Sequence, residues 1–220
     1  MPQSDVKTRK FLAAHKKPIS AALYVLIVGL MVVPVLAVTM SHAKMQDTWT
    51  AIMRVSGLWA FTLIFFNLVT GPLSKYFYAI FKPKRVQAFH IATGASGFAL
   101  AVMHGTIVFV MAHYRDHPAI WLIGPIALGL MIVTMAVAAN RKRLPQYWRR
   151  IHQLNYVIFV AVFIKAMMTG TSVVSNTVVG NTMKAVMIFE LAAVLFGLGV
   201  RVRQGLSARA ARQAVEAETD

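Results

Sequence analysis

The chain has 220 residues, of which 58% are hydrophobic and 14% charged, and its 23 Lys and Arg residues against 7 Asp and Glu give a net charge of +16. This composition excludes an intrinsically disordered chain, and it disfavours a water-soluble globule because too few polar residues remain to cover a surface. The absence of Cys excludes disulfides, iron–sulfur clusters and any other cofactor bound through a thiolate, which leaves His as the main soft metal ligand.

Long apolar stretches alternate with short basic connections along the chain. A transmembrane helix needs about 20 mostly apolar residues to cross about 30 Å of hydrocarbon. Each lone span must satisfy its own backbone, and there is no alternating barrel pattern, so we expect an all-α, six-helix integral membrane bundle. The predicted spans are residues 18–41, 53–74, 87–112, 119–139, 152–171 and 184–203.

The segments outside these spans are polar. Residues 1–17 form a basic N-terminal arm, residues 18–203 the bundle, and residues 204–220 a polar tail, which we expect to fray from Ser207 to Asp220. We interpret the first apolar run as a retained helix, because it is too long for the apolar region of a signal peptide, although Ser41 to Ala43 faintly resembles a cleavage site.

The basic residues are distributed asymmetrically between the two sides of the predicted membrane. The N-terminal arm, the second and fourth connections and the C-terminal stretch from Arg201 onward together carry 18 of the 23 Lys and Arg residues. The positive-inside rule therefore predicts that both termini are cytoplasmic, in a multi-pass protein of the bacterial inner membrane. Because this topology already accounts for the charge, we expect no nucleic-acid partner.

The seven His residues fall into two groups. His15 lies in the basic arm, and His42, His113 and His117 lie at or beyond the outer helix ends. We interpret these four as solvated interface residues, with a metal site from the outer three as the alternative. His90, His104 and His152 lie inside or at the border of the hydrocarbon, where an ionisable group is costly and indicates function.

The spacing of these three His residues predicts a shared ligand. His90 and His104 are 14 residues apart, close to four helical turns, so they point from one face of their helix about 21 Å apart. His90 and His152 each follow basic residues closely, which puts both rings at one level near the cytoplasmic surface. Two neutral imidazoles at one level can bind haem iron axially. The alternative is that each His only hydrogen-bonds a neighbouring helix.

The position matching the depth of His104 on the fifth span is Lys165. A protonated Lys has no lone pair for a metal ion. Glu190 lies at a similar depth on the last span, and we hypothesise a Lys165–Glu190 ion pair there. In the alternative, Lys165 extends to the membrane surface and Glu190 is protonated.

Three segments carry a resemblance to a known family. They are Ser56-Gly57-Leu58-Trp59 leading to Gly71-Pro72-Leu73-Ser74-Lys75, then His90 to Gly94 with Met103-His104, and Tyr147-Trp148-Arg149-Arg150-Ile151-His152. In their order and separation they resemble the ferric-reductase-type transmembrane domain, which is shared by ferric reductases, NADPH oxidases and the YedZ/MsrQ haem-binding subunit of methionine sulfoxide reductase.

The resemblance implies two stacked b-type haems, each held by one His from the third helix and one from the fifth. Carried over, it assigns His90 and His152 to an inner haem and His104 with Lys165 to an outer one. The chain departs from the family at Lys165, which puts the outer haem in doubt. Arg85, Arg149 and Arg150 flank the inner site, where they either pair with propionates or only set the topology. Arg54, at the outer side, is expected to anchor the helix at the interface, with contact to an anionic lipid or to an outer propionate as the alternative.

No phosphate-binding loop of a flavin or nicotinamide domain is visible, since Gly94-Ala-Ser-Gly97 lies within a span and indicates either close helix packing or space beside a porphyrin. The sequence therefore predicts an electron-transfer subunit that relays single electrons with a separate redox partner protein, quinone or flavin as donor or acceptor. The alternative is a redox-inactive scaffold subunit of a larger membrane complex, which Lys165 favours.

Overall fold

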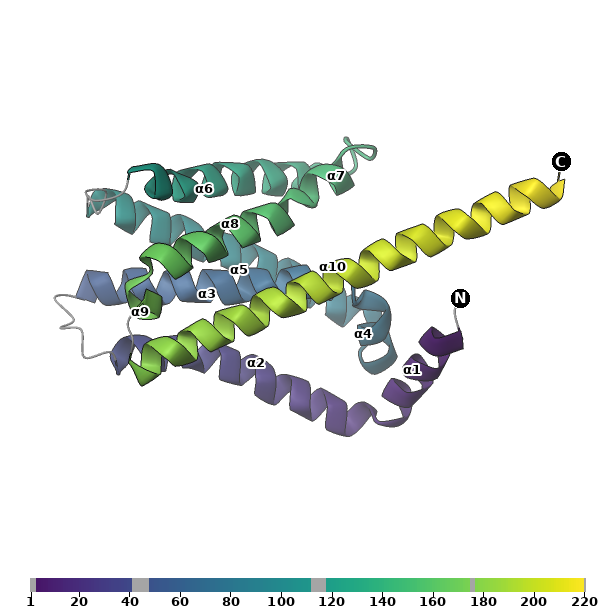
Figure 1. Ribbon diagram of the computed structural model, residues 1–220, viewed down its shortest axis with the longest axis horizontal. Helices are drawn as coiled ribbons and strands as arrows, with labels where there is room; N and C mark the ends of the chain where they lie inside the picture. The colour runs from purple at the N-terminus through teal and green to yellow at the C-terminus, as the bar shows by residue number, and fades with distance from the viewer. Residues whose placement is uncertain (1–2, 41–47, 112–117, 175–176, 220) are drawn as a thin grey trace.

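The computed structural model describes residues 3–40, 48–111, 118–174 and 177–219, and all regular structure in these ranges is helical. Figure 1 shows long helices packed side by side into one bundle, which confirms the all-α prediction. The helices are α1 (Gln3–Ala14), α2 (Lys16–Thr39), α3 (Thr48–Thr70), α4 (Ser74–Ile80), α5 (Pro83–Val110), α6 (Pro118–Ala139), α7 (Trp148–His152), α8 (Leu154–Thr169), α9 (Thr171–Val174) and α10 (Val178–Thr219).

The described residues contain six helical stretches that are long and apolar enough to cross a bilayer, and each coincides with one predicted span. They are α2, α3, α5, α6, α7 with α8, and α10. The connections are short, and Gly71 and Pro72 follow the end of α3, as expected of a proline that lacks a backbone N–H. Pro34 and Pro125 lie within α2 and α6.

The surface of the bundle is apolar, as a bilayer requires. Val25 on α2, Phe109 on α5 and Phe196 on α10 are 73%, 71% and 66% exposed. Water would penalise such a surface, whereas lipid tails do not. This pattern supports a multi-pass membrane protein.

The core lies where α3 contacts α2, α8 and α10. Phe61 of α3 stacks on Phe159 of α8 with ring centroids 4.2 Å apart, and Met183 and Met187 of α10 are fully buried beside them. Trp59 ties α3 to α2 by donating its indole N–H to the Met31 carbonyl over 2.7 Å. The core therefore centres on α3, which holds both sites described below.

The α3–α5 interface is packed through glycine. A Cβ placed on Gly97 of α5 would lie 3.1 to 3.3 Å from Ile64 and Leu63 of α3, and one on Gly94 would lie 2.7 Å from the Asn67 amide. The predicted role of this glycine pair in close helix packing is confirmed.

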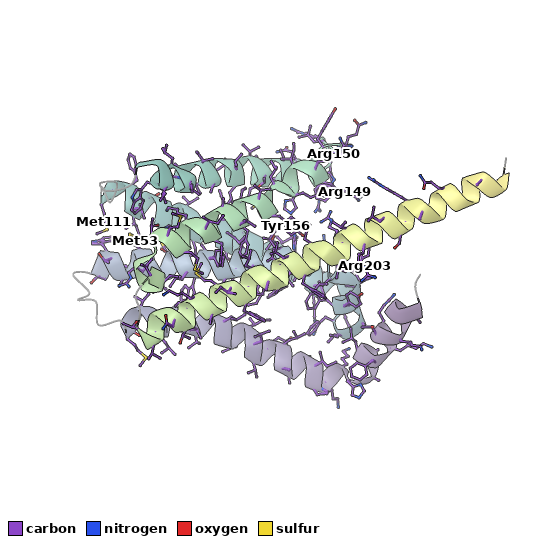
Figure 2. All side chains as sticks on the ribbon, viewed as in Figure 1. Met53, Met111, Arg149, Arg150, Tyr156 and Arg203 are labelled. Carbon is purple, nitrogen blue, oxygen red and sulfur yellow. The ribbon has the colours of Figure 1, made fainter. Side chains whose placement is uncertain are left out.

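Both chain ends lie at one end of the bundle, which we call the termini end. Figure 1 shows the N-terminus, the C-terminus, α4 and α7 there, with α9 at the opposite end. Arg149, Arg150 and Arg203 lie toward the termini end in Figure 2, and Met53 and Met111 lie at the other. The charge asymmetry read from the sequence is therefore a spatial one.

Two polar segments are helical where no helix was predicted. The basic arm forms α1, and α10 continues without a break to Thr219, so the expectation of a frayed tail is wrong. The tail is rich in Ala, Arg, Gln and Glu, which have high helix propensity, and it has no Gly or Pro after Gly205. Once the last span has formed, such residues extend it at little cost.

Candidate functional site

Two imidazoles meet near the termini end. His90 of α5 and His152 of α7 have ring centroids 6.2 Å apart and ring planes at 67°. Two imidazoles bound on opposite sides of one metal ion, each by a bond of about 2.0 Å, would have ring centres about 6 Å apart. The spacing therefore fits a pair of axial ligands, and it leaves no direct hydrogen bond between the rings to explain it.

The His90 ring is oriented by α3. Its Nδ1 lies 3.0 Å from the Asn67 carbonyl oxygen, which can only accept, so Nδ1 carries the proton and donates it. The Asn67 side-chain amide in turn donates to the His90 carbonyl over 2.6 Å. The Thr70 hydroxyl, 3.0 Å from the same Nδ1, completes the shell. This arrangement leaves the Nε2 lone pair available to a metal ion, as in most metal-binding His residues.

His152 is held less tightly than His90. The amide nitrogen of Asn155 lies 3.4 Å from its Nδ1, and the Asn155 side-chain oxygen accepts a hydrogen bond from Thr134 of α6 over 2.8 Å. The ring sits beside Trp148, with centroids 6.2 Å apart. His152 is therefore positioned by the long contact with Asn155 of α8 and by Trp148 of its own helix, α7.

A cavity of about 240 Å³ adjoins these rings, and we call it the His90 cavity. Among the flanking arginines named from the sequence, Arg149 lines it, whereas Arg85 and Arg150 are not among its lining residues. Its complete lining is Asn67, Leu68, Gly71, His90, Trp148, Arg149, His152, Gln153, Tyr156 and Arg201. A porphyrin held by the two rings would have to extend beyond this space.

Sequence reasoning missed Arg201 and Tyr156, which both line the His90 cavity. Arg201 of α10 lies close to His152 and within hydrogen-bonding reach of the Tyr156 hydroxyl. Arg201 was counted only among the topological charges, because nothing in its own segment distinguishes it from Arg203. The available signal was depth, since Arg201 is the first basic residue after the apolar run of α10.

His104 lies at the opposite end of α5, in a second and larger cavity. Its Nδ1 donates to the Met53 carbonyl of α3 over 2.8 Å, which leaves Nε2 without its proton. A Cβ on Gly57 would lie 2.7 Å from Nδ1, so a glycine is needed to seat the ring against α3. His104 thus has the same kind of support as His90.

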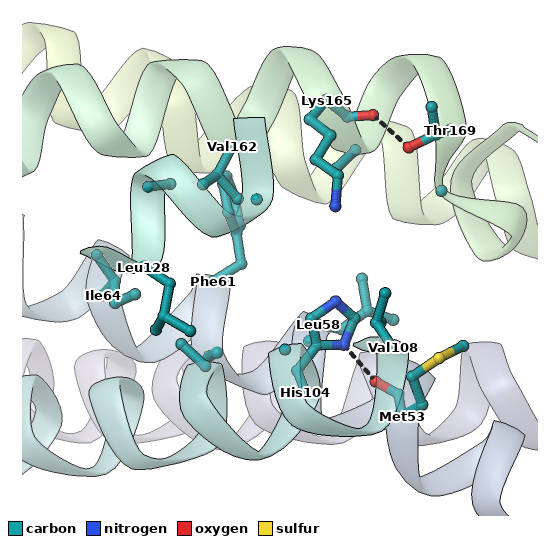
Figure 3. Close-up of a pocket in the computed structure, with 18 of the residues that line it drawn as sticks. Met53, Leu58, Phe61, Ile64, His104, Val108, Leu128, Val162, Lys165 and Thr169 are labelled. Atoms are coloured by element: carbon teal, nitrogen blue, oxygen red, sulfur yellow. Dashed lines mark hydrogen bonds between the residues drawn. The ribbon is translucent and has the colours of Figure 1, made fainter. Parts of the chain in front are cut away.

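Lys165 of α8 faces His104 across this cavity, which has a volume of about 510 Å³ and which we call the His104 cavity (Figure 3). The ammonium group lies 5.1 Å from the centre of the Trp121 ring of α6. It also lies 3.1 Å from where a Cβ on Gly124 would be. The structure therefore brings together His104 and Lys165, but the second imidazole that the family pattern would require is absent from this sequence.

Two sequence-based interpretations at this end are wrong. The Lys165–Glu190 ion pair is not formed, because the fully buried Glu190 carboxyl group faces Thr62 of α3 and not Lys165. Equal depth was correct, but the two side chains point to different faces. Arg54 was expected at the interface, yet it is only 9% exposed and lines the His104 cavity.

The described residues contain no cluster of three or more His, Asp or Glu side chains that could hold a metal ion. The alternative metal site at His42, His113 and His117 lies outside the described residues. The pair formed by His90 and His152 is thus the arrangement that fits a metal-centred cofactor within the described chain.

No protein-family model matches the chain, and no curated protein or solved structure is similar to it. The ferric-reductase-type resemblance accordingly rests on the motif segments alone.

Proposed function

We propose that this chain is a membrane b-type cytochrome of the ferric-reductase-type group, which relays single electrons through one haem held by His90 and His152. The observation that carries the proposal is the 6.2 Å separation of the two imidazole centres, which come from different helices and lie beside a shared cavity. A haem bound there would supply one-electron redox chemistry at its iron.

In this proposal, the residues of the chain bind the cofactor and orient its His ligands. Asn67 and Thr70 hold the His90 ring through its Nδ1, and the hydrogen bond from Nδ1 raises its basicity as a ligand. Arg149 and Arg201, both in the cavity lining, supply positive charge for carboxylate groups of the cofactor. The surrounding apolar helices keep water away, which favours a pair of neutral ligands.

The orientation of the bundle follows from its charge. The termini end collects the basic connections and the ends of α1 and α10, and the positive-inside rule puts such an end in the cytoplasm. We therefore place both termini and the His90–His152 pair on the cytoplasmic side of a bacterial inner membrane. A separate redox protein, flavin or quinone would donate or accept the electron there.

The test is the haem content of the purified protein. Reduced-minus-oxidised absorbance with pyridine haemochrome quantitation should give about one b-type haem per chain. His90→Ala and His152→Ala should each abolish it, whereas the matched variant His15→Ala, in the exposed turn between α1 and α2, should retain it. Wild-type protein without haem, isolated from cells supplied with a haem precursor, would contradict the proposal.

A second candidate function is a redox-inactive scaffold subunit of a membrane complex. Lys165 favours it, because the second imidazole of a transmembrane haem pair is missing. The small volume of the His90 cavity also favours it. The same measurement separates the two functions, since a scaffold would purify without haem while its fold stays intact by circular dichroism.

A further inference from the structure

His104 and Lys165 present complementary hydrogen-bonding groups to the His104 cavity. The His104 Nδ1 donates to the Met53 carbonyl, so Nε2 of the neutral ring is an acceptor. Figure 3 shows this Nε2 on the side of the ring that is turned toward the Lys165 ammonium group, which is a donor. These two described side chains make no hydrogen bond to each other. A ligand hydroxyl placed between them can donate to Nε2 and accept from Lys165 at the same time.

The rest of the cavity suits an apolar body. Figure 3 shows Ile64 and Leu128 away from His104 and Lys165, and Met131, Ile158 and Phe159 also belong to the lining. An ordered water needs about two to four polar partners, and these five side chains offer none. The volume of about 510 Å³ is in the range of pockets for single organic ligands, roughly 300–1,000 Å³. The cavity therefore matches one ligand that joins a hydroxyl group to an apolar body.

The cavity reaches the surface that would face lipid. Three of its lining residues, Thr106 and Phe109 of α5 and Pro125 of α6, are exposed. The opening thus lies between α5 and α6, within the membrane-spanning part of both helices. A ligand that dissolves in the bilayer can enter there without crossing water.

We propose that the His104 cavity binds the ring of a lipid-soluble quinol, the reduced form of a quinone. One hydroxyl group donates to Nε2 of His104 and accepts from Lys165, the ring packs on the apolar wall, and the hydrocarbon substituent leaves between α5 and α6. The choice of a quinol among lipid-soluble hydroxyl compounds rests on the proposed function, because a membrane cytochrome needs a partner that exchanges electrons. The inference names the chemical class of that partner and places it at the end of the bundle away from the termini.

The same contacts predict which form of the ligand binds more tightly. The carbonyl oxygens of a quinone accept from Lys165 but have no proton to donate to Nε2 of His104. A quinol satisfies both protein groups, and an acceptor left without a partner inside an apolar cavity is costly. We therefore expect the quinol to bind roughly tenfold more tightly than the quinone.

The experiment measures binding to the whole chain in anaerobic phosphatidylcholine nanodiscs, with decylubiquinone as a quencher of tryptophan fluorescence. The quinone should quench saturably, and Trp121→Phe, which alters a residue of the cavity lining, should remove most of the effect. Decylubiquinol should displace the quinone, whereas the dimethyl ether of the quinol, which has no hydroxyl proton, should displace it roughly tenfold less well or worse.

Two variants assign the contacts. His104→Leu should remove the advantage of the quinol over its ether, because the acceptor is gone. Lys165→Met keeps the apolar stem and removes the donor, so it should weaken binding of the quinone and the quinol alike. The matched variant Lys142→Met, in the exposed connection before α7, should bind both as wild type does.

Three results would overturn the proposal: equal displacement by the quinol and its ether, an undiminished preference for the quinol in His104→Leu, or a second haem per chain that His104→Leu removes. The comparison of quinol with ether uses wild-type protein, so it decides the question even if a variant does not fold. Displacement is measured without reference to haem. A chain that binds the quinol but purifies without haem contradicts only the proposed function, and a chain with haem that does not discriminate the ether contradicts only this site.

Discussion

The two cavities of the bundle have the same support on one side and different residues on the other. In each, a His of α5 donates its Nδ1 proton to a backbone carbonyl of α3, namely Asn67 for His90 and Met53 for His104. The two His residues and the two carbonyls are both 14 residues apart. The α3–α5 pair therefore presents an imidazole in the same way at two depths.

The opposite wall decides what each cavity can hold. His152 faces His90 at a spacing that suits one metal ion between them, whereas Lys165 faces His104 with an ammonium group. The cavity without the second imidazole is the larger of the two. The two cavities thus differ in the side chain that the fifth span places opposite the α5 imidazole.

The largest expected effect comes from removing that difference. Lys165→His would place a second imidazole opposite His104, and we expect haem content to rise from about one to about two per chain. Pyridine haemochrome quantitation measures it, with Lys165→Gln as the matched control that should stay at one. A stable Lys165→His protein that still binds one haem would show that the two cavities differ in more than this residue.

The next effect concerns the support of His90. Asn67→Leu removes the amide that donates to the His90 carbonyl over 2.6 Å and leaves Thr93 as its side-chain donor. Loss of a group that orients a metal-binding side chain typically lowers the affinity for the bound group about 10–100-fold. Titration of haem into apoprotein measures the loss, and Asn140→Leu, at the exposed end of α6, is the control. Equal affinity in the two variants would argue against a role of α3 in orienting the ring.

Alanine substitutions at the two closely packed glycines should each affect a different cavity. Gly57→Ala pushes a methyl group against His104, and Gly94→Ala pushes one against Asn67. Overpacking of this type costs about 1–3 kcal/mol. Both variants should melt earlier by circular dichroism, but only Gly94→Ala should weaken haem binding at His90. The idea of independent cavities fails if Gly57→Ala weakens it equally.

The smallest effect is expected at Glu190. Its carboxyl group is fully buried and faces Thr62, and Glu190→Gln keeps both the shape and an oxygen that can accept from that hydroxyl. We expect thermal stability to change by less than about 1 kcal/mol and haem content to stay the same. A large loss of stability in Glu190→Gln would show that an ion pair with Lys165 or another cation forms in the membrane.

The fold could be predicted closely from the sequence because bilayer thickness fixes the length of each apolar segment. Depth could be predicted as well, since counting from the basic connections put His90 and His152 at one level, and the rings are neighbours. The direction in which a side chain points around its helix axis could not be predicted. Lys165 and Glu190 were matched in depth, yet only Lys165 turns toward the His104 cavity.

Burial of single charged residues was also hidden from the sequence. Arg54 and Arg201 both sit near span ends, where most basic residues serve only the topology. Which of them turn inward depends on small neighbours that make room, and this information resides in the packed helices. The helical state of the tail was missed for a different reason, because polar composition was given more weight than helix propensity.

The length of α10 has a mechanical consequence. Its 42 residues span about 63 Å, roughly twice the thickness of the hydrocarbon, so close to half of it projects past the bundle as a stiff rod. Arg201 stands where this rod leaves the other helices, beside His152. Because Arg201 lines the His90 cavity, this cavity lies where the projecting half of α10 begins.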